Sequence, residues 1–322
     1  MSVKHDEYVS SDTKMTVQDV SGHPTQVLSL GNVEEASTRI VFIPGVPGAI
    51  GFYWQFLKSL AALTENNKFS IHAPSYPGHD VTHLTSQQRD AKLSLEEQIE
   101  HKIAFVRDVV PVGSRLILVG HSLGCFMIMQ MLKRGALSDF QLVKVGLLCP
   151  VMARMSESAS GQRLEPFYRN HPLLFRSVIW AGSLLPRFFL RPYLDTKMKN
   201  ILGIPDEYRG DIVMKGIDFV KYQPCVFNAI DTGMEAIKAT GDVDVDTLLQ
   251  HQDRLSIWYT AQDHWVPDGL YESLSREHPQ LNIHQIDTHH AFMLHKADEI
   301  AEVVSIWLTK FCDIHEVDTS SP

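Results

Sequence analysis

The sequence predicts an α/β fold in which a mostly parallel, doubly wound sheet carries one helical insertion. Short apolar runs rich in Val, Ile and Leu recur along the chain, and segments with apolar residues at helical spacing separate them. Strands that are apolar on both faces are typical of parallel sheets covered by helices. The pattern stops near residue 150 and resumes near residue 250, which predicts an insertion into one domain and not a second domain.

Six buried strands are expected, because β-branched and apolar residues dominate six short runs that end at turn or loop signals. These runs are 39–45, 69–80 with a break at Pro74, 115–120, 143–150, 254–263 and 281–287. Helices are expected over 52–63, 94–110, 125–135, 266–278 and 296–312. The second of these begins at Ser94 and has Glu97 three residues later, which is the signature of a capping box.

The insertion, at about residues 151–250, differs in composition from the sheet-forming part. Its segment 171–194 is rich in leucine and aromatic residues but also contains Arg176, Arg187 and Arg191. We expect a mostly helical cap over the C-terminal edge of the sheet. The cap and the sheet together form the single domain that the sequence predicts over residues 38–312.

The composition excludes several classes of protein. A net charge of −9 argues against nucleic acid as a partner, because phosphate binding needs clustered Lys and Arg. No stretch of eighteen uncharged apolar residues occurs, so no transmembrane span is expected. The four cysteines are widely spaced, which indicates reduced thiols. Residues 1–37 are expected to form a polar N-terminal segment without a signal peptide, and residues 313–322 a C-terminal tail.

The motif Gly-His-Ser-Leu-Gly at residues 120–124 is the main candidate for chemistry. It lies between a predicted strand and a predicted helix, where ligands bind in parallel sheets. A G-x-S-x-G sequence in this position is typical of a strand–turn–helix that exposes a nucleophilic serine. Because a neutral hydroxyl is a weak nucleophile, Ser122 would need a base within hydrogen-bond reach and a carboxylate to orient that base.

The partners of Ser122 should follow it in the order acid and then histidine. Asp263 comes directly after a predicted strand, although a turn or helix-capping aspartate would look the same. Asp287 is too near the candidate histidines in sequence, and Asp253 precedes its strand. His289 and His290 both lie in the loop before the last helix, and the spacing leaves both open. The His-His-x-x-x-x-His spacing there also suits a metal, but no further ligand set accompanies it, so no metal or cofactor is expected.

Two backbone N–H groups are expected to receive an oxyanion. One belongs to Leu123, the residue after the serine, at the start of a helix whose dipole favours negative charge. The other is expected in the loop 43–48, where glycines allow close approach and Val46 keeps an N–H that Pro47 lacks.

Several segments together resemble the lipid droplet-associated hydrolase family of the α/β-hydrolase superfamily, over about residues 39–308. These segments are IPGVPG with the FY that follows it, EQIEHKIAFVRDVVP, LVGHSLG, MSES, DHWVP and HAF. The resemblance implies an α/β-hydrolase fold with Ser122 as nucleophile, Asp263 as the acid and His290 as the base, the last decided by the HAF match. Where members of that family read Pro-Gly-Asn-Pro-Gly, this chain has Val46, which removes a polar side chain but keeps the backbone donor.

The resemblance also implies a function. A serine hydrolase of lipid carboxylic esters is expected, acting on sterol esters or other neutral lipids at the cytosolic face of lipid droplets and the endoplasmic reticulum. The alternative is a droplet-surface protein that binds lipid or a partner with little or no turnover. Residues 171–194 suit an interfacial helix on the monolayer, or a lining for the acyl chain, and the two roles can coexist.

Overall fold

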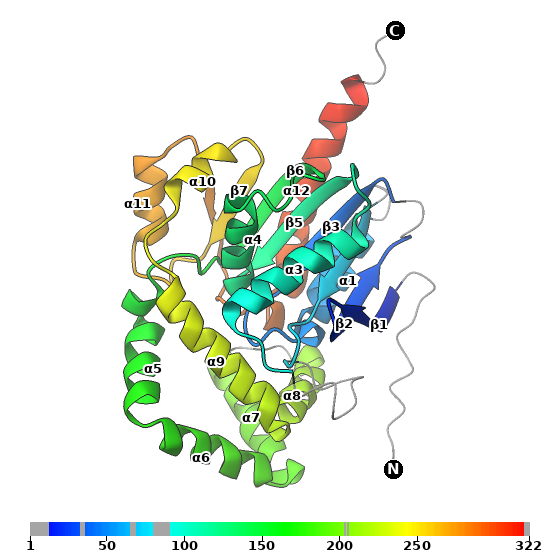
Figure 1. Cartoon of the computed structure of the whole chain (residues 1–322). Coiled ribbons are helices and arrows are strands. Elements are labelled where there is room, and N and C mark those ends of the chain that lie inside the picture. The colour runs from blue at the N-terminus through cyan, green and yellow to red at the C-terminus, as the bar shows by residue number, and fades with distance from the viewer. Residues whose placement is uncertain are drawn as a thin grey trace.

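The computed structural model describes residues 13–32, 36–64, 69–79, 91–202, 204 and 206–318 of the 322-residue chain. Eight strands form one sheet in the order β1-β2-β4-β3-β5-β6-β7-β8 (Figure 1). They are β1 (Thr13–Val20), β2 (His23–Leu30), β3 (Thr38–Ile43), β4 (Phe69–Pro74), β5 (Arg115–His121), β6 (Gln141–Leu148), β7 (Leu255–Tyr259) and β8 (Asn282–Gln285). The six strands from β3 to β8 are parallel, whereas β1 and β2 pair antiparallel. This sheet confirms the predicted α/β class.

Helices cover both faces of the sheet, as expected for strands that are apolar on both sides. Apolar side chains of α1 (Trp54–Leu63) and α12 (Ala297–Asp318) form one core cluster with the sheet, and α3 (Leu95–Val109), α4 (Leu123–Lys133) and α11 (Leu270–Glu277) contribute to the other. Neighbouring residues of a strand alternate between the two clusters, as Val41 and Phe42 do. The sheet therefore lies between two packed core layers, and these layers hold the parallel strands in position.

The hairpin of β1 and β2 lies in the segment that the sequence analysis treated as polar. Ser21 and Gly22 form its two-residue turn, and both have positive φ angles, 53° and 82°. Such a pair suits the right-handed twist of a hairpin. Buried apolar residues are few in β1, because it is the edge strand, so the alternating pattern of a half-buried strand is weak there. Residues 1–12 lie outside the described residues.

The last helix is longer than the sequence predicted. α12 continues to Asp318, so residues 313–318 are helical and not part of a tail, whereas residues 319–322 lie outside the described residues. The reason is visible in the sequence, because no glycine or proline occurs between the start of α12 and Pro322 to stop a helix.

The described residues of the insertion between β6 and β7 form six α-helices, which follow the short 3-10 helix η3 (Met155–Glu157). They are α5 (Ala159–Asn170), α6 (Pro172–Leu184), α7 (Arg187–Leu202), α8 (Asp206–Lys221), α9 (Gln223–Ala239) and α10 (Val245–Gln250). Helices α5 to α9 extend from the sheet at the lower end of Figure 1. The helical insertion of the predicted fold class is thus present.

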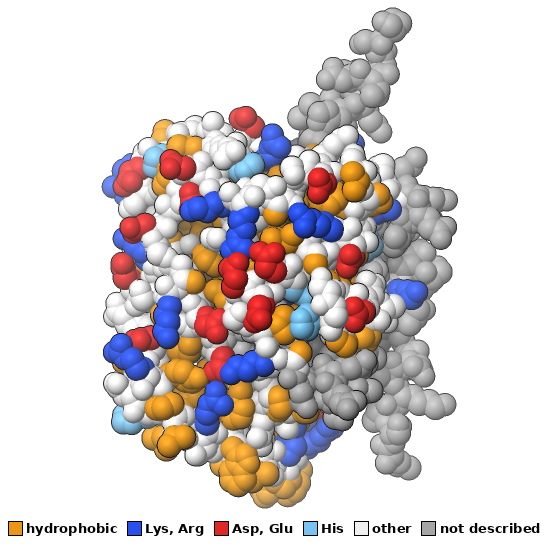
Figure 2. Space-filling model, in the orientation of Figure 1, with side chains coloured by type: hydrophobic (Ala, Val, Ile, Leu, Met, Phe, Trp, Pro, Cys, Tyr) orange, Lys and Arg blue, Asp and Glu red, His pale blue; other side chains and the backbone are white. Residues whose placement is uncertain are grey.

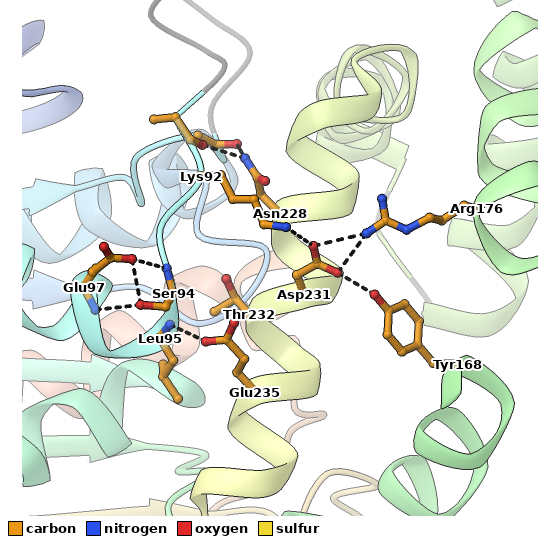
Figure 3. Close-up of polar contacts among 12 residues, drawn as sticks. Lys92, Ser94, Leu95, Glu97, Tyr168, Arg176, Asn228, Asp231, Thr232 and Glu235 are labelled. Carbon is orange, nitrogen blue, oxygen red and sulfur yellow. Dashed lines mark hydrogen bonds and ion pairs between the residues drawn. The ribbon is translucent and has the colours of Figure 1, made fainter. Parts of the chain in front are cut away.

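Helix α9 ties the insertion to the sheet-bearing part through polar side chains (Figure 3). Asn228 donates from Nδ2 to the carbonyl oxygens of Gly78, at 2.9 Å, and Ala91, at 2.8 Å. On the same helix Asp231 pairs with Lys92 at 3.1 Å.

The same carboxylate of Asp231 also contacts the outer helices. It accepts a hydrogen bond from Tyr168 of α5 at 2.6 Å and pairs with Arg176 of α6 at 3.3 Å. The other end of α9 is held where Glu235 accepts the Leu95 N–H at 2.6 Å. One helix therefore links the sheet-bearing part to the outer helices.

Candidate active site

Ser122 lies at a sharp turn between β5 and α4. Its backbone has φ 54° and ψ −122°, a strained conformation that a non-glycine residue rarely adopts. The glycines of the motif allow this turn to pack closely against neighbouring segments. A Cβ atom at Gly120 would lie 2.8 Å from the Ile128 side chain, and one at Gly124 would clash with the carbonyl oxygen of Ile43. The turn thus places the Ser122 hydroxyl at the carboxyl end of the sheet.

The structure brings Asp263 and His290 to this serine. His290 Nε2 lies 2.8 Å from Ser122 Oγ, and His290 Nδ1 lies 2.6 Å from Asp263 Oδ2. The serine follows β5, the aspartate lies in the loop after β7, and the histidine lies between β8 and α12. An ionised carboxylate only accepts hydrogen bonds, so Nδ1 carries the proton and Nε2 is left to accept from the hydroxyl. A hydroxyl in this arrangement can be deprotonated by the imidazole.

The Asp263 carboxylate is held from two sides. Its Oδ1 accepts the Trp265 N–H at 2.9 Å, and its side chain is only 6% exposed, while that of His290 is 17% exposed. Because this bond reaches the N–H two residues ahead, Asp263 also stabilises the turn, which is the alternative role that the sequence suggested. The aspartate fills that role and orients the imidazole at the same time.

The rival residues lie elsewhere. His289 is exposed, and its ring packs against His295 with centroids 5.0 Å apart. Asp287 is exposed and pairs with Lys296 at 3.2 Å, and Asp253 is exposed before β7. Within the described ranges, no group of three or more His, Cys, Asp or Glu side chains is arranged to hold a metal ion.

The loop expected to donate to an oxyanion lies against the serine. A Cβ atom at Gly45 would be 2.6 Å from Ser122 Cβ, so this part of the loop fits only a glycine. The adjacent Val46 is followed by a cis peptide bond to Pro47. The other expected donor, Leu123, is the first residue of α4, and the first N–H groups of a helix have no acceptor within it. Both predicted donors therefore belong to segments that adjoin Ser122.

Side chains of the segment after β4 hold this loop in place. Tyr76 donates its hydroxyl to the Pro44 carbonyl at 2.7 Å, and its N–H to the Gly48 carbonyl at 2.8 Å. His79 Nδ1 lies 2.8 Å from the Pro47 carbonyl. The hydrogen bonds to its carbonyl groups thus fix the loop, in which the Val46 N–H is the predicted oxyanion donor.

Comparison with known sequences places this site in a family. The profile described as "Lipid-droplet associated hydrolase" matches residues 36–293, which is most of the chain. The chain belongs to the lipid droplet-associated hydrolase family. The human lipid droplet-associated hydrolase is 29% identical over 313 residues, covering 88% of this chain and 91% of its own length. That of Drosophila melanogaster is 29% identical over 304 residues, covering 89% of this chain and 95% of its own length. The resemblance found in the sequence motifs is thus confirmed.

Solved structures confirm the α/β-hydrolase fold for this member of the family. A serine hydrolase from Cycloclasticus zankles has a TM-score of 0.63 with 16% identity, covering 92% of this chain and 98% of its own. The 2-hydroxy-6-oxo-6-phenylhexa-2,4-dienoate hydrolase from a Rhodococcus strain has a TM-score of 0.60 with 16% identity, covering 91% of this chain and 97% of its own. At such identities the likeness concerns the fold alone.

Proposed function

We propose that this member of the family is a serine hydrolase that cleaves carboxylic esters of lipids, such as sterol esters or other neutral lipids. The observation that carries the proposal is the pair of hydrogen bonds that joins Ser122, His290 and Asp263, at 2.8 and 2.6 Å. The names of the family and of its relatives support hydrolysis at lipid droplets. The mechanism needs no metal and no cofactor.

The geometry supports a two-step mechanism. Ser122 Oγ attacks the ester carbonyl carbon while His290 Nε2 takes the hydroxyl proton, and Asp263 stabilises the imidazolium. The N–H groups of Leu123 and Val46 receive the oxyanion, each worth about 3–4 kcal/mol in the transition state. The carbon–oxygen bond breaks, His290 protonates the leaving alcohol, and an acyl group remains on Ser122. Water activated by His290 then releases the carboxylic acid.

The outer helices support a lipid surface as the place of action. Large apolar side chains are exposed on α6, α7 and the turn between them: Leu173, Leu174, Val178, Trp180, Leu184, Leu185, Phe188, Phe189 and Tyr193. Figure 2 shows hydrophobic side chains gathered at this lower end of the molecule. We call these residues the apolar patch. Monomeric soluble proteins rarely expose so many large apolar side chains together, and such patches mark interaction sites.

The shape of the patch suits the surface of a monolayer. Among the described residues no single helix is long and apolar enough to cross a membrane. Helices α6 and α7 pass such a test only as a pair, and a bend of 113° separates them. Arg187 within this segment pairs with Asp218 of α8 at 2.7 Å, so its charge is balanced by a carboxylate. We propose that the apolar patch docks on lipid droplets and on the endoplasmic reticulum, at their cytosolic faces.

Labelling with a fluorophosphonate tests the chemistry. The wild-type protein should be modified at Ser122, and Ser122→Ala should abolish both labelling and turnover on a panel of acyl esters that includes cholesteryl and glyceryl esters. A folded wild-type protein that is neither labelled nor active would refute the proposal. Such a result would favour the alternative, a droplet-surface protein that binds lipid or a partner with little or no turnover.

Flotation with triolein droplets covered by phosphatidylcholine tests the docking. Leu173 and Phe188 are 80% and 68% exposed, and burying such side chains contributes about 1.5–3 kcal/mol each. The double variant Leu173→Glu/Phe188→Glu should therefore bind droplets at least about 100-fold more weakly. Val112 is 82% exposed in the loop between α3 and β5, so Val112→Glu is the matched control and should bind normally. Equal binding of all three proteins would refute docking through the patch.

A further inference from the structure

A chain of three hydrogen bonds, two of them buried and one partly buried, runs beneath the candidate active site. The Gly45 N–H donates to the Tyr53 hydroxyl oxygen at 2.9 Å, and this oxygen lies 2.7 Å from His121 Nδ1. His121 Nε2 in turn lies 2.8 Å from the carbonyl oxygen of His290. Tyr53, the last residue of the short helix η1 (Ile50–Tyr53), is fully buried, and His121 is 1% exposed.

The chemistry of the groups fixes the direction of every bond in this chain. A carbonyl oxygen only accepts, so the His121 Nε2 carries a proton and donates it to His290. Burial lowers the pKa of His121 well below its usual value, so its ring is neutral and Nδ1 is an acceptor. The Tyr53 hydroxyl therefore donates to Nδ1 and accepts from Gly45. Each donor then has one acceptor. No other arrangement satisfies the Gly45 N–H, the Tyr53 hydroxyl, the neutral His121 ring and the His290 carbonyl together.

This chain joins the three parts that the proposed mechanism needs. Gly45 precedes Val46 and lies against Ser122, so its position determines the distance between the oxyanion loop (43–48) and the serine. His121 directly precedes Ser122 at the strained turn. The bond to the His290 carbonyl holds the backbone of the residue whose ring contacts Ser122.

We propose that Tyr53 and His121 are positioning residues that set the distance between the oxyanion loop, the nucleophile turn and the base. This inference rests on the proposed serine hydrolase function. Packing alone would not require the hydroxyl, because the Tyr53 ring already contacts Phe42 and His121, with centroids 5.0 and 5.6 Å apart. A phenylalanine would make the same ring contacts but would leave the Gly45 N–H and the His121 Nδ1 without partners.

The decisive variant is Tyr53→Phe, assayed on a soluble acyl ester. Misplacing catalytic groups by a fraction of an ångström to an ångström lowers turnover about tenfold to hundredfold, so kcat should fall by this factor. KM should stay within about twofold of the wild-type value, since ground-state binding does not use the oxyanion loop. The affinity of a trifluoromethyl ketone, which forms a tetrahedral adduct with Ser122, should fall in parallel with kcat/KM.

Tyr259→Phe is the matched control. Tyr259 is also a buried tyrosine, and its hydroxyl contacts Gln285 at 3.4 Å and none of the groups described above. Both variants lose one tyrosine hydroxyl that takes part in a hydrogen bond, but only Tyr53→Phe should lose turnover. If Tyr53→Phe does not fold, His121→Asn keeps an acceptor for Tyr53, removes the donor to His290, and should also lower kcat at constant KM. An active wild type with kcat unchanged in the variant that folds would overturn the inference.

Nitrogen NMR of the His121 imidazole separates this inference from the proposed function. Whether or not the protein turns over esters, the ring should stay neutral with its proton on Nε2 over the pH range around 6.5 in which an ordinary histidine titrates. A ring that carries its proton on Nδ1, or that becomes charged in this range, would overturn the arrangement. A wild-type protein without turnover but with the expected tautomer would instead contradict only the proposed function.

Discussion

Acidification should destabilise this protein strongly, because several histidines are buried in neutral form. His72 on β4 lies between the hydroxyls of Ser29, at 3.3 Å, and Ser70, at 3.1 Å, and its pKa is lowered to about 4, mainly by burial. The pKa of His79 is likewise lowered to about 4 by burial. In the unfolded chain both rings take up protons near pH 6.5. Below that pH the unfolded state therefore binds more protons than the folded state, and stability falls with pH.

The magnitude follows from these pKa values. Each of the two histidines has a folded pKa that is about 2.5 below its unfolded value, which corresponds to about 3 kcal/mol. This contribution is fully present above pH 6.5 and is lost as the pH falls to about 4. The two rings together account for about 6–7 kcal/mol, comparable to the whole stability of an ordinary domain. Burial of His101 and His121 acts in the same direction.

Urea unfolding followed by circular dichroism at stepwise pH measures this effect. The unfolding free energy should decline steadily between pH 6.5 and about 4. His72→Gln keeps a hydrogen-bonding side chain but removes one titrating group, so its slope should be shallower by about 1.4 kcal/mol per pH unit. His289→Gln is the control, since it makes the same replacement at an exposed position. A wild-type free energy that stays flat over this range would refute the reasoning.

Three further predictions concern the turn, a helix end and α9. Gly124→Ala should destabilise the protein and lower fluorophosphonate labelling, because the methyl group meets the Ile43 carbonyl, whereas Gly182→Ala, with open space around it, should be neutral or slightly stabilising in the same thermal melt. Ser94→Ala should cost about 1 kcal/mol in urea unfolding, since it removes the capping box of α3. Asp231→Asn should cost no more than about 1 kcal/mol, because its cationic partners are largely solvated; a larger loss would show that α9 depends on this carboxylate.

The sequence predicted the parallel strands well because their physical signal is local. Buried parallel strands are continuous apolar runs, and several of them end at glycine or proline, as β4 does at Pro74. Strand β1 was missed because an edge strand needs few apolar residues. Strand β2 is internal, but its buried positions include the polar Thr25 and Gln26, which weakens the apolar signal. The turn of their hairpin at Ser21 and Gly22 was the available signal, since a small residue followed by glycine suits a two-residue hairpin turn.

The candidate site was predictable to the extent that each residue follows a strand. Ser122 and Asp263 could be placed this way, but spacing does not separate His289 from His290 in their shared loop. The HAF resemblance implied His290, and the structure places that ring against the serine. Tyr53 belongs to the FY dipeptide that is part of the family resemblance, but its role left no signal in the sequence. It lies in a helix-like apolar run, and its contact with His121, 68 positions away, depends on how that run packs against the sheet. Residues that act through tertiary contacts are invisible to pattern and spacing.

The proposed ester hydrolysis and the proposed docking on lipid surfaces involve different parts of the molecule, so experiments can separate them. The apolar patch lies on α6, α7 and their connecting turn, whereas the hydrogen bonds of Ser122, His290 and Asp263 come from loops of the sheet. The variant Leu173→Glu/Phe188→Glu should therefore hydrolyse a water-soluble short-chain ester at the wild-type rate, yet lose turnover on lipid in droplets. Loss of both activities in a folded variant would mean that the patch also shapes the site, and would favour the lining of an acyl pocket over a docking surface.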